Sequence, residues 1–183
     1  MSFIETFMGK TIDPTDPHTF EIDIKDIAHA LSLQCRFSGH CPAHYSVAEH
    51  SVRVSEHLED LGASKEICLW GLLHDASEAY LVDLPRPLKE HTELGRAYRL
   101  AESNLQRVIC ACFGLPEQEP DEVWRADDAL LATEVRDLMR GYRPYWDKIE
   151  SPPLPDRIRP WQTIVAEKEF LSKFDALGGA YVL

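Results

Sequence analysis

Apolar residues recur at helical spacing along most of the chain, and the intervals between these runs are rich in proline, glycine and polar residues. This pattern predicts helices because positions three and four apart share one face of a helix. We expect helices over 23–32, 46–61, 64–83, 88–113, 121–140 and 161–177, and we find no convincing strand. The predicted fold class is all-α, a helical bundle of about six helices.

The second of these helices has a clear start. Ser46 and Glu49 form a capping box, in which each side chain can satisfy a free backbone N–H group. Gly62 ends the run. His50 falls on the apolar stripe, so we expect it to point inward, whereas we interpret His57, two turns further on, as a surface residue.

The remaining segments predict loops. Residues 1–22 contain two Asp-Pro pairs and predict an ordered loop or a short extended arm. Residues 35–45 form a polar loop, and the proline-rich residues 143–160 predict a long loop crossing the surface. We expect one domain over 1–183, with a core at about 22–140 and a C-terminal loop and helix at 141–183.

Composition narrows the function. The 183 residues include 31 acidic and 19 basic ones, a formal charge of −12, which argues against binding a nucleic acid polymer. A small anionic substrate remains compatible, because a bound cation can invert the local field. We expect a cytoplasmic protein without a membrane partner, since we see no signal peptide and no long apolar stretch. The five cysteines include no CxxC pair, and we interpret them as reduced thiols.

Ionisable residues interrupt three of the apolar helical faces: His50, the pair His74-Asp75, and Asp127. Such groups are costly to bury unless they are paired or bind a metal. Two imidazoles and two carboxylates carry a charge of about −2, which suits a divalent cation such as Co, Mn, Zn, Fe, Ni or Mg. Each residue alone has a simpler interpretation, for example an ion pair of Asp127 with Arg125. Four on three converging helices favour a metal site.

Two further carboxylates follow the HD pair. Glu78 comes four residues after His74 and therefore one turn along the same helical face, and Asp83 comes at the end of that predicted helix. Neither is needed to complete the metal ligands, so both are free to move protons.

The order H…HD…D resembles the HD-domain phosphohydrolases. The run from His74 to Lys89, HDASEAYLVDLPRPLK, is similar to the bacterial 5′-deoxynucleotidases and to their phage relatives, which include a small dATP triphosphohydrolase. So are Arg36-Phe37 and the segment YSVAEHS at 45–51. The resemblance covers roughly residues 22–140.

The resemblance implies a role for each matching residue. His50, His74, Asp75 and Asp127 would be the metal ligands, Glu78 and Asp83 would act in catalysis, Asp83 would also read a sugar lacking the 2′-hydroxyl, and Arg36 would bind phosphate. Phe37 stands where that branch often has Trp, and it would still stack on a base. Lys89 is a second phosphate candidate or, equally, a surface lysine.

We therefore expect hydrolysis of a deoxyribonucleoside 5′-monophosphate to a deoxynucleoside and phosphate. One alternative is a triphosphohydrolase that releases tripolyphosphate, which should bring more cations to the site, from Lys89, Arg86 or Arg125. Another is a metal-dependent module that binds a nucleotide without turnover. By analogy with relatives we expect a homo-oligomer, a dimer or larger.

Overall fold

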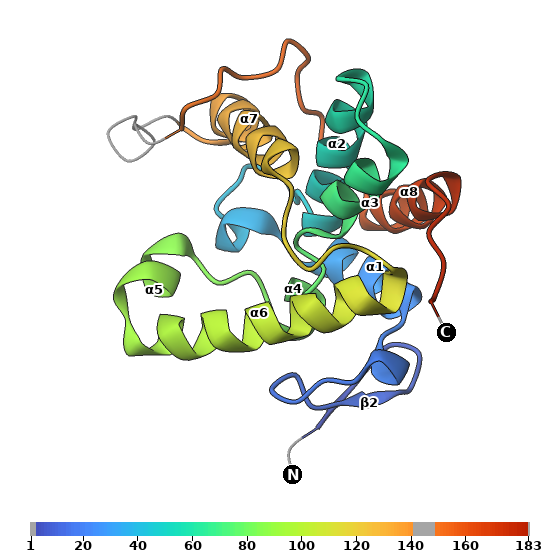
Figure 1. Ribbon diagram of the computed structural model, residues 1–183. Coiled ribbons are helices and arrows are strands. Elements are labelled where there is room, and N and C mark those ends of the chain that lie inside the picture. The colour runs from blue at the N-terminus through green and yellow to red at the C-terminus, as the bar shows by residue number, and fades with distance from the viewer. Residues whose placement is uncertain (1–2, 141–148, 183) are drawn as a thin grey trace.

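The computed structural model describes residues 3–140 and 149–182 (Figure 1). These residues form a bundle of α-helices with one small two-stranded sheet, which confirms the all-α prediction. The helices are α1 (Ile24–Leu33), α2 (Val47–Asp60), α3 (Lys65–Leu73), α4 (Glu78–Leu81), α5 (Arg86–His91), α6 (Glu93–Phe113), α7 (Asp121–Leu138) and α8 (Thr163–Ala176). Every helix in the described residues is too short or too polar to span a lipid bilayer.

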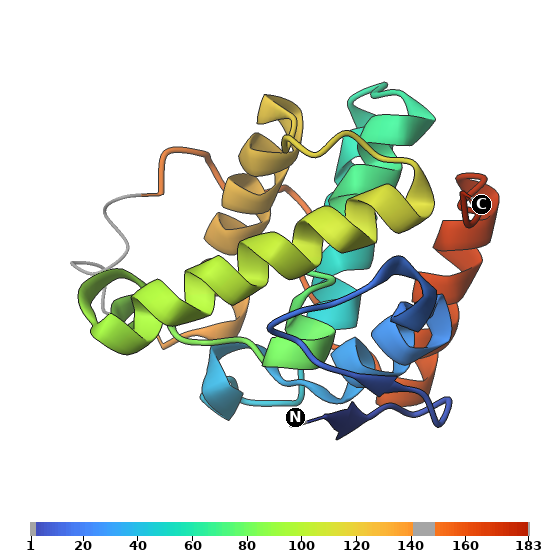
Figure 2. The same ribbon diagram turned by 60° about the horizontal axis from the view of Figure 1, so that its bottom comes forward.

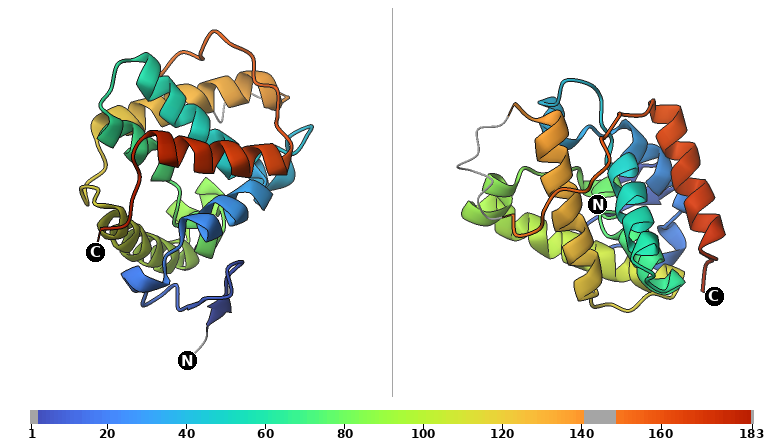
Figure 3. Two further views of the ribbon diagram at one scale, coloured as in Figure 1. Left: turned by 90° about the vertical axis from the view of Figure 1, so that its right-hand side faces the viewer. Right: turned by 90° about the horizontal axis from the view of Figure 1, so that it is seen from above.

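α2 is the central helix of the bundle and contacts α1, α3, α7 and α8. α8 lies across α1 and α2 on one side (Figure 3), and the long α6 runs along the other side of the molecule (Figure 2). The buried apolar side chains form one cluster, from Ile12 near the N-terminus to Leu177 after α8. Because α2 is surrounded on several sides, a polar residue on one of its inward faces is removed from water.

α3 lies very close to α2 because Gly71 has no side chain. A Cβ atom at this position would collide with Leu58 of α2, which is fully buried. This close approach brings the C-terminal end of α3 to the side of α2 that carries His50.

The N-terminal arm contains a feature that the sequence pattern did not predict. β1 (Ile4–Glu5) pairs antiparallel with β2 (Thr11–Ile12), with Ile4 opposite Ile12. The expectation of no strand was therefore wrong. Strands of two residues are too short to show an alternating pattern, and this hairpin is held by the fully buried Ile12 and by a turn at Gly9, where φ is 76°.

Two of the predicted helices are interrupted. The helix expected over 64–83 ends at Leu73, residues 74–77 form a turn, and α4 begins at Glu78. The side chain of Gln106 on α6 stabilises this turn, because it donates to the Leu73 carbonyl (2.8 Å) and accepts from Ser77 N (3.3 Å).

The helix expected over 88–113 is divided into α5 and α6. Thr92 Oγ1 accepts from Gly95 N (2.9 Å) and caps the start of α6. Gly95 also lacks the Cβ atom that would collide with the backbone of Lys89.

The chain after α7 is fixed to α7 by carboxylates. Asp128 Oδ2 accepts from Glu150 N (3.0 Å) and Ser151 N (2.8 Å), and Asp137 Oδ2 accepts from Ile158 N (2.9 Å). Residues 149–162 contain no helix or strand, as predicted for this loop. The part of the prediction that concerns residues 143–148 lies outside the described residues.

Candidate metal centre

His50 is presented by the first turn of α2. Ser46 Oγ accepts from Glu49 N (3.0 Å), as the capping box predicts. The Glu49 side chain does not return to Ser46, however. Its Oε2 accepts from Trp161 N (2.8 Å) and its Oε1 from Arg53 (2.8 Å). That half of the capping prediction was wrong, because partners from elsewhere in the fold and one turn along α2 hold the carboxylate.

The His50 ring is fully buried, and each of its nitrogens faces a different group. Nδ1 lies 2.6 Å from Oε1 of Glu134, a carboxylate on α7 that is also fully buried. A carboxylate in this position accepts a hydrogen bond from Nδ1–H, which leaves the lone pair of Nε2 free. His50 Nε2 points to His74 Nε2, 3.2 Å away.

His74 and Asp75 sit where α3 ends. His74 Nδ1 lies 2.7 Å from the Gly71 carbonyl, so this ring too donates from Nδ1 and presents Nε2. Asp75 Oδ2 lies 3.3 Å from His74 Nε2 and 3.7 Å from His50 Nε2. The potential ligand atoms of His50, His74 and Asp75 all lie within 4.8 Å of one another, so these three residues could hold a metal ion.

Asp127 completes the set from α7. Its Oδ1 lies 3.1 Å from His50 Nε2 and 4.0 Å from His74 Nε2. The structure therefore brings together all four residues that the sequence nominated as ligands. Asp128, the next residue, accepts hydrogen bonds from the loop after α7 instead.

The charges of the cluster are strongly coupled. Burial lowers the pKa of His74, but the carboxylates of Asp75 and Asp127 and the Gly71 carbonyl together outweigh burial and raise it to about 10. Conversely, burial raises the pKa of Asp75, but the two histidines and Arg36 hold it well below its usual range. Two imidazole nitrogens that face each other next to two carboxylates require positive charge between them, which either protons or a cation can supply.

Arg36 and Glu134 support this cluster. Arg36 follows α1 in η2 (Arg36–Gly39), a short 3₁₀ segment. Its NH1 lies 3.4 Å from Asp75 Oδ2, and its NH2 lies 3.0 Å from Glu134 Oε2. The structure thus places Arg36, which was predicted to bind phosphate, in contact with Asp75, a candidate metal ligand. Phe37 is half-buried, with its ring centroid 5.6 Å from the Arg36 guanidinium carbon.

Sequence reasoning gave Glu134 no role. The signal was present, because Glu134 lies on an otherwise apolar stripe of α7, seven residues and about two turns after Asp127. A charged residue in such a stripe indicates a buried partner. Its identity could not be read from the sequence, since His50 lies 84 positions away.

Glu78 begins α4 beside this cluster and is almost completely buried. Lys89 Nζ lies 3.2 Å from Glu78 Oε1 and 2.8 Å from Glu102 Oε1. Glu78 Oε2 is buried and has no hydrogen-bond partner among the described residues. Burial first, and then the charges of Asp75 and Asp83, raise the pKa of Glu78 well above its ordinary value.

Asp83 and Lys89 follow in the segment after α4. The side chain of Gln34 accepts from Asp83 N (3.1 Å) and donates to the Glu78 carbonyl (2.9 Å), which ties the two predicted catalytic residues together. Lys89 is half-buried and ion-paired, so its interpretation as a free surface lysine was wrong.

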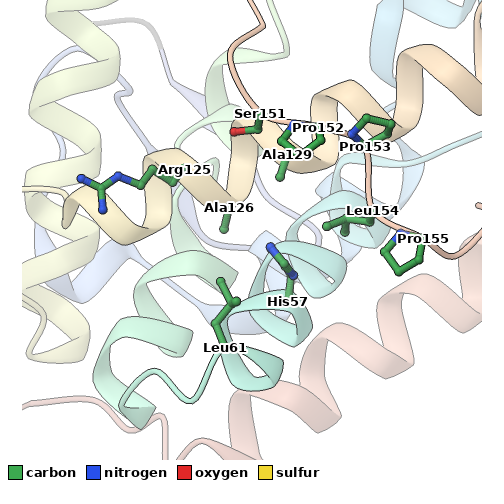
Figure 4. A pocket seen from close by; sticks show the side chains of 10 residues that line it. All are labelled: His57, Leu61, Arg125, Ala126, Ala129, Ser151, Pro152, Pro153, Leu154 and Pro155. Carbon is green, nitrogen blue, oxygen red and sulfur yellow. The ribbon is translucent and has the colours of Figure 1, made fainter.

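A separate groove of about 330 Å³ lies between the C-terminal end of α2 and α7 (Figure 4). It is lined by His57, Leu61, Arg125, Ala126, Ala129 and the Ser151–Pro155 segment. In Figure 4 the Arg125 side chain extends away from the other side chains of the groove. His57 is half-buried here and lines the groove, so it lies at the surface as predicted but is partly covered. None of the predicted site residues lines this groove.

The fold and the site together define an all-α protein with a His/Asp cluster that could hold a metal ion. The chain is 40% identical over 153 residues to YfdR of Escherichia coli (strain K12), across 84% of this chain and 82% of YfdR, and it belongs to the same family. A second relative, from Rhodobacter capsulatus, is 36% identical over 132 residues, across 70% of this chain and 66% of the relative. Both relatives are described as uncharacterized proteins. No model of a known protein family matches the chain.

Proposed function

We propose that this protein is a divalent-metal-dependent phosphohydrolase that converts deoxyribonucleoside 5′-monophosphates to a deoxynucleoside and phosphate. One observation carries the proposal: Glu78, a buried carboxyl group with one unpartnered oxygen, lies three residues after Asp75 of the His/Asp cluster. A purely structural metal site would not need such a group. The resemblance of the H…HD…D residues to the HD-domain phosphohydrolases supports the same assignment.

The donor set fits a divalent cation. Both rings commit Nδ1 to an acceptor and direct Nε2 to a shared point, beside the carboxylates of Asp75 and Asp127. Imidazole suits Zn, Mn, Fe, Co and Ni, and the carboxylates also accept Mg. A divalent ion bound here supplies Lewis acidity toward a phosphoryl oxygen and water.

Glu78 is the residue that we assign to proton transfer. Lys89 holds Oε1, so Oε2 remains to accept a proton from the attacking water and to return it to the leaving 5′-oxygen. The raised pKa of Glu78 suits this role, because surroundings that favour the protonated carboxyl group help it to take up a proton and to deliver it to the leaving group.

Arg36, Phe37 and Asp83 would bind the nucleotide. The Arg36 guanidinium has five N–H groups, and the Asp75 and Glu134 contacts leave others for a phosphate oxygen. Phe37 would stack on the base. Asp83 would contact the sugar and favour a substrate without a 2′-hydroxyl, and the bond of its backbone to Gln34 fixes its place beside Glu78.

The positions of the cations favour a monophosphate over a triphosphate. Of the three candidates, Lys89 contacts a site residue, but Glu78 and Glu102 already balance its charge. Arg125 lines the separate groove, and Arg86 is exposed and makes no ion pair with the described residues. We therefore keep the triphosphohydrolase reaction as the second candidate.

Product analysis tests the proposal. The purified protein would be stripped of metal with a chelator, supplied with Co²⁺, Mn²⁺ or Mg²⁺, and incubated separately with dAMP, AMP, dATP and dGTP. Release of deoxyadenosine and phosphate from dAMP, with AMP left intact, is the expected chromatogram. Tripolyphosphate from dATP would replace the monophosphate assignment, and nucleotide binding without turnover for every metal would indicate a binding module.

The Glu78→Gln variant tests the mechanism. We expect turnover to fall by about 10²- to 10⁴-fold while metal content and nucleotide binding persist. Glu102→Gln is the matched control, since Glu102 contacts the same lysine, and it should retain most of the activity. Undiminished turnover by Glu78→Gln would remove Glu78 from the mechanism.

A further inference from the structure

Two thiols approach each other in the loop between α1 and α2. The Sγ atoms of Cys35 and Cys41 lie 3.5 Å apart, and both residues are half-buried. The other three cysteines are buried, and none of them contacts a second sulfur among the described residues. One pair of thiols therefore combines proximity with access to solvent.

The backbone holds this pair in place. Cys35 forms a β-bridge with Ser46, and Arg36 N donates to the Tyr45 carbonyl (2.9 Å). On the other side of the loop, the Cys41 thiol lies 3.8 Å from the Arg36 carbonyl. The approach of the two sulfurs is thus built into the loop and does not depend on two freely rotating side chains.

The two sulfurs must come closer before they can bond. A disulfide requires an S–S distance of about 2.05 Å, so the sulfurs must close by about 1.5 Å. Phe37 and Ser38 have φ of 55° and 50°, and Gly39 has φ of 77°, so the second half of η2 is a left-handed turn, closed by one hydrogen bond from His40 N to the Phe37 carbonyl (3.0 Å). Ser38 and Gly39 are exposed, so their backbone can shift without disturbing the core.

We propose that Cys35 and Cys41 form a redox-active dithiol that closes to a reversible disulfide and fixes the loop carrying Arg36. With hydrogen peroxide as oxidant, one thiolate attacks an oxygen and breaks the O–O bond; the sulfur becomes a sulfenic acid, and the departing hydroxide takes up the proton that the thiol lost and leaves as the first water. The second thiol then attacks that sulfur, the S–S bond forms and a second water leaves. Two thiols lose two electrons and two protons, and one peroxide is reduced to two waters.

The position of the bond gives it a consequence for the candidate site. It closes a seven-residue ring that contains Arg36 and Phe37, and Arg36 contacts both Asp75 and Glu134. Oxidation would fix the residues that contact the cluster from this side. The meaning of this effect for turnover rests on the proposed function, whereas the chemistry of the thiols does not.

Mass spectrometry tests the proposal without any activity measurement. Trypsin cleaves after Arg36 and therefore separates Cys35, in peptide 26–36, from Cys41, in peptide 37–53. After treatment of the native protein with hydrogen peroxide, we expect these two peptides as one linked species. The intact mass should fall by about 2 Da, and the thiols that can be alkylated after unfolding should fall from five to three. Dithiothreitol should reverse each change.

The variants Cys35→Ser and Cys41→Ser should each abolish the linked species. The melting temperature of the wild type should rise by about 5 °C on oxidation, because a short closed loop restricts the unfolded chain. Neither serine variant should show this rise. The proposal is overturned by the absence of a linked species, by links among other cysteines, by irreversible gain of oxygen, or by a lower melting temperature after oxidation.

Discussion

The two ends of α2 each present a histidine to α7, and the surroundings of these histidines differ in chemistry. At one end His50 of α2 faces Asp127 and Glu134 of α7. At the other end, two turns along α2, His57 faces the alanines of α7 and the proline-rich segment. The same two helices therefore carry a charged cluster at one end and a largely apolar groove at the other.

The surroundings shift the pKa values of His50 and His57 in opposite directions. Burial and the charge of Arg36 lower the pKa of His50, but Glu134 and Asp127 outweigh them and raise it. Burial lowers the pKa of His57, and the charge of Asp60 only partly offsets this. The groups around each ring thus decide the direction of its pKa shift, and its position in an apolar stripe does not.

Removing each histidine should give the largest contrast between the two ends. We expect His50→Ala to reduce bound metal from about one equivalent per chain to below about one tenth, because it removes a central ligand together with the partner of Glu134 Oε1. His57→Ala should bind metal as the wild type does. Elemental analysis of dialysed protein measures both, and full metal content in His50→Ala would contradict the assignment.

The support of His50 by Glu134 should have the next largest effect. Glu134→Gln keeps the shape but loses the charge that orients Nδ1–H, so we expect metal affinity to fall about 10- to 100-fold. Asp137→Asn on the same helix is the control, since Asp137 pairs with Arg136 and Arg157 outside the cluster. Competition with a fluorescent chelator gives both affinities. Equal affinities in the two variants would show that Glu134 does not support the site.

Neighbouring aspartates on α7 should separate metal binding from stability. Asp128→Ala removes the acceptor for two backbone N–H groups, and we expect a loss of about 1–2 kcal/mol in urea unfolding. Its metal content should not change. Asp127→Ala should do the reverse and lose metal. Loss of metal in Asp128→Ala would show that Asp128 is a ligand and would contradict the assignment of Asp127 from its distances to the two histidines.

The smallest expected effect concerns the pH dependence at His57. Its pKa is lowered below 6.5 in the folded protein, so the unfolded chain takes up the proton first as the pH falls. The stability that the neutral ring contributes is present above pH 6.5 and is lost as the pH falls through the folded pKa. The urea midpoint should therefore drop slightly less between pH 7 and pH 5 in His57→Gln than in the wild type. A larger drop in the variant would reverse the sign.

Much of the bundle could be predicted because its signals are local. α1, α2, α7 and α8 begin and end within about two residues of the predicted bounds. The end of α3 could not be predicted, because no proline or glycine marks it. Gln106, a residue of another helix, stabilises the turn there.

The candidate site also combines features that the sequence could predict with features that it could not. The four ligand candidates were visible because ionisable residues in apolar stripes are costly to leave alone. The pairings were not visible, because they join residues far apart in the sequence: Glu134 to His50, and Lys89 to Glu102 and Glu78. The catalytic and nucleotide-binding roles of Glu78, Asp83 and Arg36 remain predictions.

The absence of a side chain at Gly71 affects the geometry of the candidate metal centre. α3 rests directly against Leu58 of α2. Even one methyl group at position 71 would therefore collide with Leu58 unless the side chain or the helix moved. The same residue offers its carbonyl to His74, so spacing and ring orientation share one origin. A side chain at position 71 would therefore displace either Leu58 or α3, and a shift of α3 would move the His74 ring together with the carbonyl that orients it.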